Sequence, residues 1–111
     1  MNYKVISEKY SIEKLLSEIE NYKQEELFFE EEISRYANKK SKGSLTARYL
    51  IKKILINEYN SLKFSDISIL NNSTGKPVLN INNLKTDIEK IHISISHTKE
   101  DVAVLIVIDN E

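Results

Sequence analysis

The spacing of the hydrophobic residues changes about halfway along this chain of 111 residues, and the change restricts the folds it can adopt. Residues 45–60 contain no glycine or proline, and their apolar side chains recur every three or four positions, as on one face of a helix. Residues 91–96 instead alternate apolar and polar side chains, as in a strand with one buried face. This change of repeat predicts an α+β fold, with helices in the first half and strands in the second.

Two helices are expected in the first half. Ser11 is a suitable N-cap for the first, because apolar residues at helical spacing follow it. The second is the long helix over residues 45–60, with Ser44 as its N-cap and an apolar stripe made of Ala47, Leu50, Ile51, Ile54 and Leu55. A short strand over residues 1–7, a helical segment over residues 29–37 and a basic loop over residues 38–43 complete this half.

Four strands are expected in the second half, over residues 64–70, 78–82, 91–96 and 102–108. The polar residues 71–77 form the turn between the first two strands. Residues 102–108 are almost all apolar, which predicts a strand buried on both faces. We therefore expect a meander of antiparallel strands packed against the long helix, in a single domain of residues 1–111.

The composition excludes several classes of protein. A chain without cysteine has no disulfide, thiolate metal site or cysteine nucleophile, and such a chain fits the reducing cytoplasm. No apolar run approaches the roughly 18 residues that span a bilayer, and residues 1–10 lack the apolar stretch of a signal peptide. We therefore expect a soluble cytoplasmic protein that does not contact a membrane.

The net charge of −1 hides an uneven distribution along the chain. Residues 38–63 contain seven Lys or Arg against one Glu, whereas the segments on either side are acidic. A central basic block favours an anionic partner that docks at one place, although a solvated helix face explains it equally well. The sequence pI near 6.2 argues against nucleic acid as that partner.

Polar side chains suited to proton transfer or phosphate binding gather at the end of the strand over residues 91–96. His92, Ser94 and Ser96 share one face, and His97, Thr98 and Lys99 follow in the turn. His97 is a candidate general base or phosphate-binding group because histidine titrates near neutral pH. The alternative is that this face is simply the solvated side of a sheet.

Two pairs on the long helix have the spacing of neighbours on one face. Arg48 and Lys52 lie four residues apart, as do Lys53 and Asn57. The cations could bind phosphates, or they could extend past the edge of the core into solvent.

Several stretches resemble the holo-acyl-carrier-protein synthase family of 4′-phosphopantetheinyl transferases over residues 8–108. The matching stretches are residues 44–52 around Arg48, residues 64–69, Gly75-Lys76-Pro77, and residues 91–100 around His97. The resemblance implies transfer of the phosphopantetheine arm of coenzyme A to a serine of acyl carrier protein. It also implies Mg²⁺, held by an aspartate in the first strand and a glutamate in the long helix, with oxygen ligands that suit this cation.

The sequence departs from the family pattern at the metal site. Glu8 stands at the position of the aspartate, and Lys53 stands at the position of the glutamate. An ammonium neutralises one phosphate charge, but it repels a dication and cannot bridge several oxygens. Asn57 also replaces a phosphate-contacting lysine, and the glycine-rich segment after the helix is absent. We therefore expect Mg²⁺ binding at Glu8 to be weak or lost.

The resemblance also implies roles for individual residues. It makes His97 and Lys52 catalytic, and it makes Lys14 a contact of the carrier protein. Coenzyme A contacts fall on Arg48, Lys53, Lys76 and Ser96. Small members of this family resemble homotrimers with active sites between subunits, so a homotrimer is expected. The alternatives are a non-catalytic relative that binds carrier protein or coenzyme A, and a subunit that completes the site of a partner transferase.

Overall fold

The computed structural model describes residues 2–82 and 90–109. Its helices are α1 (Ile12–Ile19), α2 (Gln24–Leu27), α3 (Glu30–Tyr36) and α4 (Lys42–Glu58), and its strands are β1 (Tyr3–Ser11), β2 (Ile67–Asn71), β3 (Pro77–Ile81), β4 (Ile91–His97) and β5 (Asp101–Asp109). Turns of 3-10 helix cover Lys39–Ser41 and Phe64–Asp66. The α+β fold class is confirmed. Met1, expected in the first strand, lies outside the described residues.

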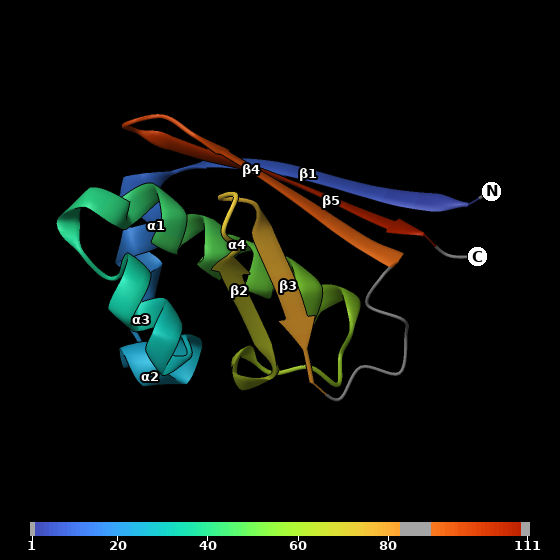
Figure 1. Ribbon diagram of the computed structural model, residues 1–111, viewed down its shortest axis with the longest axis horizontal. Coiled ribbons are helices and arrows are strands. Elements are labelled where there is room, and N and C mark those ends of the chain that lie inside the picture. Colours follow the sequence, from blue (N-terminus) through green and yellow to red (C-terminus); the bar gives the residue numbers. More distant parts are fainter. Residues whose placement is uncertain (1, 83–89, 110–111) are drawn as a thin grey trace.

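The strands form two antiparallel sheets, whereas a single meander was expected. One sheet has the order β1-β5-β4, and the other is the β2–β3 hairpin. The first strand pairs with the last along its whole length, from Tyr3 opposite Asp109 to Ser11 opposite Asp101. The expectation was wrong because β1, predicted as a short strand, is nine residues long and matches β5 in length. It therefore pairs with β5 and completes a separate sheet. Figure 1 shows α4 below the three-stranded sheet, with α1, α2 and α3 gathered toward one end of it.

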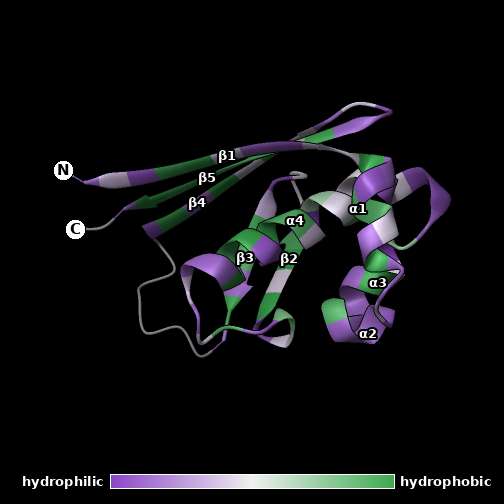
Figure 2. Ribbon diagram, turned by 180° about the vertical axis from the view of Figure 1, so that it is seen from behind, coloured by the Kyte–Doolittle hydropathy of each residue, from purple (hydrophilic) through white to green (hydrophobic). Residues whose placement is uncertain are grey.

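The core lies between α4 and the inner faces of the strands. In Figure 2, hydrophobic residues concentrate on α4 and on the strands beside it, while hydrophilic residues cover α2 and the turn between β4 and β5. Ser11 caps α1 as predicted, since its hydroxyl accepts a hydrogen bond from the Lys14 backbone N–H at 3.1 Å. Among the described residues, no helix is long and apolar enough to cross a membrane.

Helix α4 begins earlier than its sequence predicts. Ser44 was expected as the N-cap, but the helix starts at Lys42 and follows directly on the 3-10 turn Lys39–Ser41. The Asn38 side chain accepts a hydrogen bond from the Lys40 backbone N–H at 3.0 Å, which orders the segment that was expected to be a loop. The polar composition of residues 38–43 thus reflects a capped helical entry.

Two cations of α4 that were expected to face a ligand are buried. Lys52 is 0% exposed, and its Nζ lies 2.6 Å from Glu32 Oε1 and 2.8 Å from the Leu27 carbonyl oxygen. The second carboxylate oxygen of Glu32 accepts from the Ile69 N–H at 2.9 Å. Burial lowers the pKa of Lys52, and the charge of Glu32 opposes that shift. This pair joins α3, α4 and β2.

Arg48 makes a second internal connection one turn earlier in α4. Its guanidinium donates to the carbonyl oxygens of Ile69 and Ser44, at 2.7 and 3.0 Å, and to Asn71 Oδ1 at 2.9 Å. Arg48 Cζ also lies 3.7 Å from the centre of the Tyr36 ring. Burial is the main cause that lowers the pKa of Arg48. Groups of the same chain therefore occupy the hydrogen-bond donors of the Arg48 guanidinium.

The outer face of the three-stranded sheet remains partly apolar and exposed. The inward residues of β5 (Val102, Val104, Ile106 and Ile108) are buried, but Leu105 on the other face is 39% exposed. Val5 and Tyr3 of β1, on that same face, are 61% and 53% exposed. The prediction that β5 is buried on both faces is therefore wrong for the single chain. Ser94 and Ser96 of β4 face outward as predicted.

Candidate functional site

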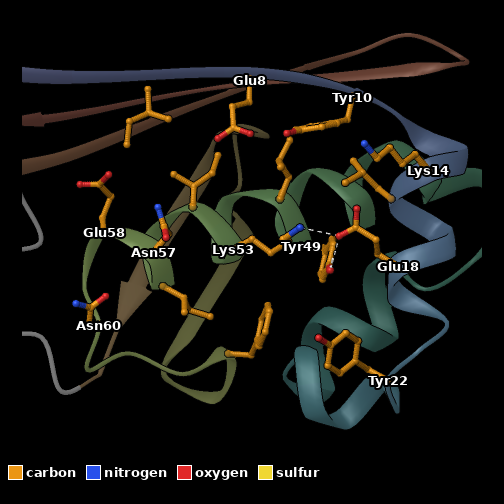
Figure 3. A pocket seen from close by; sticks show the side chains of 16 residues that line it. Glu8, Tyr10, Lys14, Glu18, Tyr22, Tyr49, Lys53, Asn57, Glu58 and Asn60 are labelled. Atoms are coloured by element: carbon orange, nitrogen blue, oxygen red, sulfur yellow. Dashed lines mark hydrogen bonds and ion pairs between the residues drawn. The ribbon is translucent and has the colours of Figure 1, made fainter.

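An open pocket of about 790 Å³ lies between the three-stranded sheet, α1 and α4. Glu8 and Tyr10 of β1 line its upper side, and Lys14 and Glu18 of α1 line one end (Figure 3). Tyr49, Lys53, Asn57 and Glu58 reach it from α4. Period-2 alternation in β1 points residues 8 and 10 to the same face, and i,i+4 spacing does the same for residues 14 and 18 and for residues 49 and 53.

The centre of the pocket is an ion pair between two helices. Lys53 Nζ donates to Glu18 Oε1 at 2.6 Å, and the Tyr49 hydroxyl donates to the same oxygen at 2.9 Å. Both bonds appear in Figure 3, with Lys53 extending from α4 toward Glu18 on α1. The hydrogen bond from Lys53 is the main cause that lowers the pKa of Glu18. Burial, followed by the bond to Glu18, raises the pKa of the Tyr49 hydroxyl.

A second carboxylate, Glu8, faces this ion pair from the sheet. A hydrogen bond with Glu8 and the charge of that carboxylate raise the pKa of Tyr10. The ammonium of Lys14 lies 5.0 Å from the centre of the Tyr10 ring. The third carboxylate of the pocket, Glu58, pairs with Lys4 at 2.8 Å. The pocket thus places carboxylates and ammonium groups around one cavity.

Aromatic rings form the lower wall of the pocket. Tyr49 stacks on Phe64 with their ring centres 6.0 Å apart and their planes 2° from parallel, and Tyr22 contacts the same ring at 6.2 Å. These contacts fix the position of the Tyr49 hydroxyl, which holds Glu18. A wall of stacked rings beside charged groups suits a ligand with both an apolar part and an anionic part.

The structure brings together four of the residues singled out from the sequence. Glu8, Lys14 and Lys53 come from β1, α1 and α4, and all three line this pocket, as does Asn57. Arg48 and Lys52 do not line it. Their interior positions do not agree with the expected phosphate and catalytic roles, because groups of the same chain occupy their donors.

His97 lies away from the pocket, against the first turn of α4. A Cβ added to Gly43 would lie 2.5 Å from His97 Nδ1, so the imidazole rests directly on the glycine backbone. Lys53 follows ten residues later on the same helix, about 15 Å along its axis. A single chain therefore does not bring His97 and Lys53 to one phosphate group.

Ser96 and Lys76 also lie outside the pocket. Ser96 is exposed on the outer face of β4. Lys76 is exposed in the tight turn between β2 and β3, where Gly75 has a φ of 83°, a value that favours glycine. The backbone N–H of Lys76 donates to Asn72 Oδ1 at 3.0 Å. The turn holds this lysine at the surface.

Sequence reasoning missed Glu18, Tyr49 and Phe64. The signal for Glu18 was its i,i+4 relation to Lys14 on the helix predicted after Ser11. No comparable signal identifies its partner Lys53, which is 35 residues away. The sequence carries no signal that marks Tyr49 or Phe64 as a site residue, and most of Tyr49 is buried.

The pocket does not suit the divalent cation that the resemblance implies. Mg²⁺ requires several oxygen ligands in near-octahedral geometry. Here an ammonium stands between the carboxylates and already takes one oxygen of Glu18. Within residues 2–82 and 90–109, no group of three or more His, Cys, Asp or Glu side chains is arranged to hold a metal ion.

Two solved structures share this arrangement of helices and strands. A holo-(acyl-carrier-protein) synthase from Bacillus anthracis, in complex with CoA (3′,5′-ADP), is 19% identical with a TM-score of 0.74, and 96% of each chain is covered. The holo-[acyl-carrier-protein] synthase of Helicobacter pylori, in complex with coenzyme A, is 20% identical with a TM-score of 0.73, over 96% of this chain and 100% of that one. The fold is therefore that of the holo-acyl-carrier-protein synthases.

Sequence comparison identifies the family. A family model described as 4′-phosphopantetheinyl transferase, N-terminal, matches residues 6–108. A holo-[acyl-carrier-protein] synthase of Bacillus velezensis is 33% identical over 112 aligned positions, which cover 94% of this chain and 90% of the relative. The chain belongs to the 4′-phosphopantetheinyl transferase family, among its holo-acyl-carrier-protein synthase type.

Proposed function

We propose that this protein binds coenzyme A in the pocket and transfers its 4′-phosphopantetheine to a serine of acyl carrier protein. The observation that carries the proposal is the convergence of Glu8, Lys14 and Lys53, from three separate elements, on one cavity. These are the positions where the family places a metal-binding aspartate, a carrier-binding arginine and a metal-binding glutamate. The reaction of the similar Bacillus velezensis protein supports the same assignment.

The proposed reaction is a phosphoryl transfer. The serine oxygen forms a bond to the phosphorus next to the pantetheine, the pyrophosphate P–O bond breaks, and adenosine 3′,5′-bisphosphate leaves. Lys53 neutralises phosphate charge in the pocket, and the stacked rings of Tyr49 and Phe64 pack against the apolar part of the ligand. Lys14, at the rim, attracts an acidic carrier protein. His97 contacts a phosphate or takes the serine proton.

We propose further that the complete site lies between copies of this chain in a cytoplasmic homotrimer. His97, Ser96 and Lys76 are far from the pocket of their own chain, so a neighbouring copy has to supply them. The exposed apolar face formed by Tyr3, Val5 and Leu105 offers a surface for that association.

A second function is favoured by one observation, the Glu18–Lys53 ion pair in the position of the metal site. A non-catalytic relative that binds carrier protein or coenzyme A, or that completes the site of a partner transferase, retains the fold and needs no dication. Co-purification with an intact transferase favours the partner role.

Mass spectrometry of a carrier protein separates these functions. The carrier is incubated with coenzyme A and this protein, with Mg²⁺ or with a chelator. Transfer adds one phosphopantetheine to the carrier, and Lys53→Met lowers the rate at least tenfold, whereas Lys23→Met, an exposed lysine outside the pocket, leaves it unchanged. No mass change at stoichiometric protein, together with measurable binding of coenzyme A or carrier, supports the non-catalytic function.

A further inference from the structure

The ion pair at the centre of the pocket is built to hold an ammonium in place. One oxygen of Glu18 accepts from both Lys53 Nζ, at 2.6 Å, and the Tyr49 hydroxyl, at 2.9 Å. Tyr49 is itself fixed by stacking on Phe64. A lysine side chain in solvent samples many rotamers. Here the bond to Glu18 holds the ammonium, and the Tyr49 hydroxyl holds the carboxylate that accepts this bond.

The held ammonium nevertheless remains open to a ligand. The Lys53 side chain is 43% exposed and that of Glu18 is 31% exposed, so the pair lies at the wall of the cavity, with one side facing the interior of the pocket. An ammonium carries three N–H donors, and the bond to Glu18 uses one of them. The remaining donors are available to phosphate oxygens.

We infer that Lys53 is the resident cation of this pocket and that Glu18 is its exchangeable counter-ion. The pair takes the place of the divalent cation that the resemblance implies. A phosphate oxygen of the ligand replaces the Glu18 carboxylate on the ammonium when the pocket fills, and no metal ion takes part in binding. The identity of the ligand as a pyrophosphate-containing coenzyme rests on the proposed function. The resident cation rests on the geometry of Lys53, Glu18 and Tyr49 alone.

The resident cation is tested with metal alone. Mn²⁺, which shares the oxygen preference of Mg²⁺, is titrated into the protein and followed by electron paramagnetic resonance. The wild type leaves millimolar Mn²⁺ free, and Lys53→Glu binds it at least tenfold more tightly because the ammonium is replaced by a further carboxylate beside Glu8 and Glu18. Lys53→Met removes the charge without adding a metal ligand, so its affinity for Mn²⁺ rises less than that of Lys53→Glu.

The metal titration has outcomes that contradict the inference. If the wild type binds Mn²⁺ as tightly as Lys53→Glu does, the inference that Lys53 is the resident cation is wrong. A folded Lys53→Glu variant, checked by circular dichroism, that gains no affinity overturns it as well. Neither result depends on coenzyme A.

The exchange is tested by calorimetric titration with coenzyme A. The wild type binds it with the same affinity in Mg²⁺ and in chelator, and Lys53→Met binds at least tenfold more weakly. Glu18→Gln keeps an acceptor for the Tyr49 hydroxyl but removes the charge that competes with phosphate, so it binds several-fold more tightly. Glu20→Gln, an exposed carboxylate at the end of the same helix, serves as the matched control.

The coenzyme titration also separates the two proposals. Mg²⁺-dependent binding by the wild type, or weaker binding by Glu18→Gln, overturns the exchange while leaving the proposed function in place. Absence of any coenzyme A binding by the wild type overturns the proposed function and the exchange together. The Mn²⁺ titration decides the resident cation in either case.

Discussion

At the scale of single residues, the chain uses its helix cations in two different ways. Lys53 faces a pocket, whereas Lys52, next to it in sequence, is sealed inside the core with Glu32. Adjacent residues on a helix are about 100° apart around its axis, so neighbouring lysines meet different surroundings. The family resemblance predicts Lys53 at the position of a metal-binding glutamate, and in the structure Lys53 lines the pocket. The resemblance assigned Lys52 a catalytic role and gave no sign of its burial, because the groups that surround Lys52 come from α2 and α3.

The buried pair gives the first prediction about stability. Glu32→Gln leaves Lys52 without a counter-charge and turns an amide N–H₂ toward a donor, either Lys52 Nζ or the Ile69 N–H. Removing one partner of a buried ion pair costs about 3–5 kcal/mol, and we expect a loss in that range in the free energy of unfolding. Urea denaturation followed by circular dichroism measures it.

Glu31→Gln is the matched control. Glu31 immediately precedes Glu32 in α3, and its ion pair with Arg35 is exposed. Exposed pairs at this spacing are worth about 0.3–0.5 kcal/mol, so this variant should unfold almost like the wild type. Equal losses in the two variants would show that burial gives the Glu32–Lys52 pair no special weight.

At the scale of elements, the sequence predicted the helices and strands better than their pairing. Helical spacing located α1 and α4, and alternation located β4, because these repeats are local properties of the chain. The pairing of β1 with β5 joins residues about 100 positions apart, and no local pattern encodes it. The start of α4 was misplaced because residues 38–43 look like a polar loop, whereas the Asn38 side chain caps a 3-10 turn that leads into the helix. At this end of α4, His97 of β4 rests against Gly43, a contact between distant elements that no local pattern encodes.

This contact predicts an unusual response to Gly43→Ala. Alanine in a helix is ordinarily about 0.8–1.0 kcal/mol more favourable than glycine. Here the new Cβ meets the His97 ring, so we expect Gly43→Ala to destabilise the protein by about 1 kcal/mol or more. In a His97→Ala background the same change should stabilise it. Thermal unfolding of the four proteins forms the double-mutant cycle, and an effect of Gly43→Ala that is independent of residue 97 contradicts the packing.

At the scale of the whole molecule, several residues with proposed roles lie outside the pocket of their own chain. The pocket lies between the sheet, α1 and α4, while His97, Ser96 and Lys76 lie on other surfaces. The resemblance predicts roles for both sets. It could not show their separation, because a motif records the order of residues along the chain and leaves open which copy supplies each one.

The exposed sheet face leads to the third prediction. Leu105→Lys combined with Val5→Lys places charges on the apolar outer face and should convert the proposed trimer to a monomer. Transfer activity should fall with the trimer, because His97 and Lys53 of different copies then separate. Sedimentation equilibrium measures the mass, and Val78→Lys, an exposed apolar residue on β3, is the control. If the wild type sediments as a monomer, the proposal that copies of the chain share a site is wrong.

The position of β5 between β1 and β4 has a consequence for how the protein is made. Both partners of this strand, β1 and β4, precede it in the chain. The nascent chain therefore carries two strands with no central partner until residue 109 has emerged, and helix α4 has no sheet to cover. Truncation before Asp101 removes this central strand, so we expect the shortened chain not to fold.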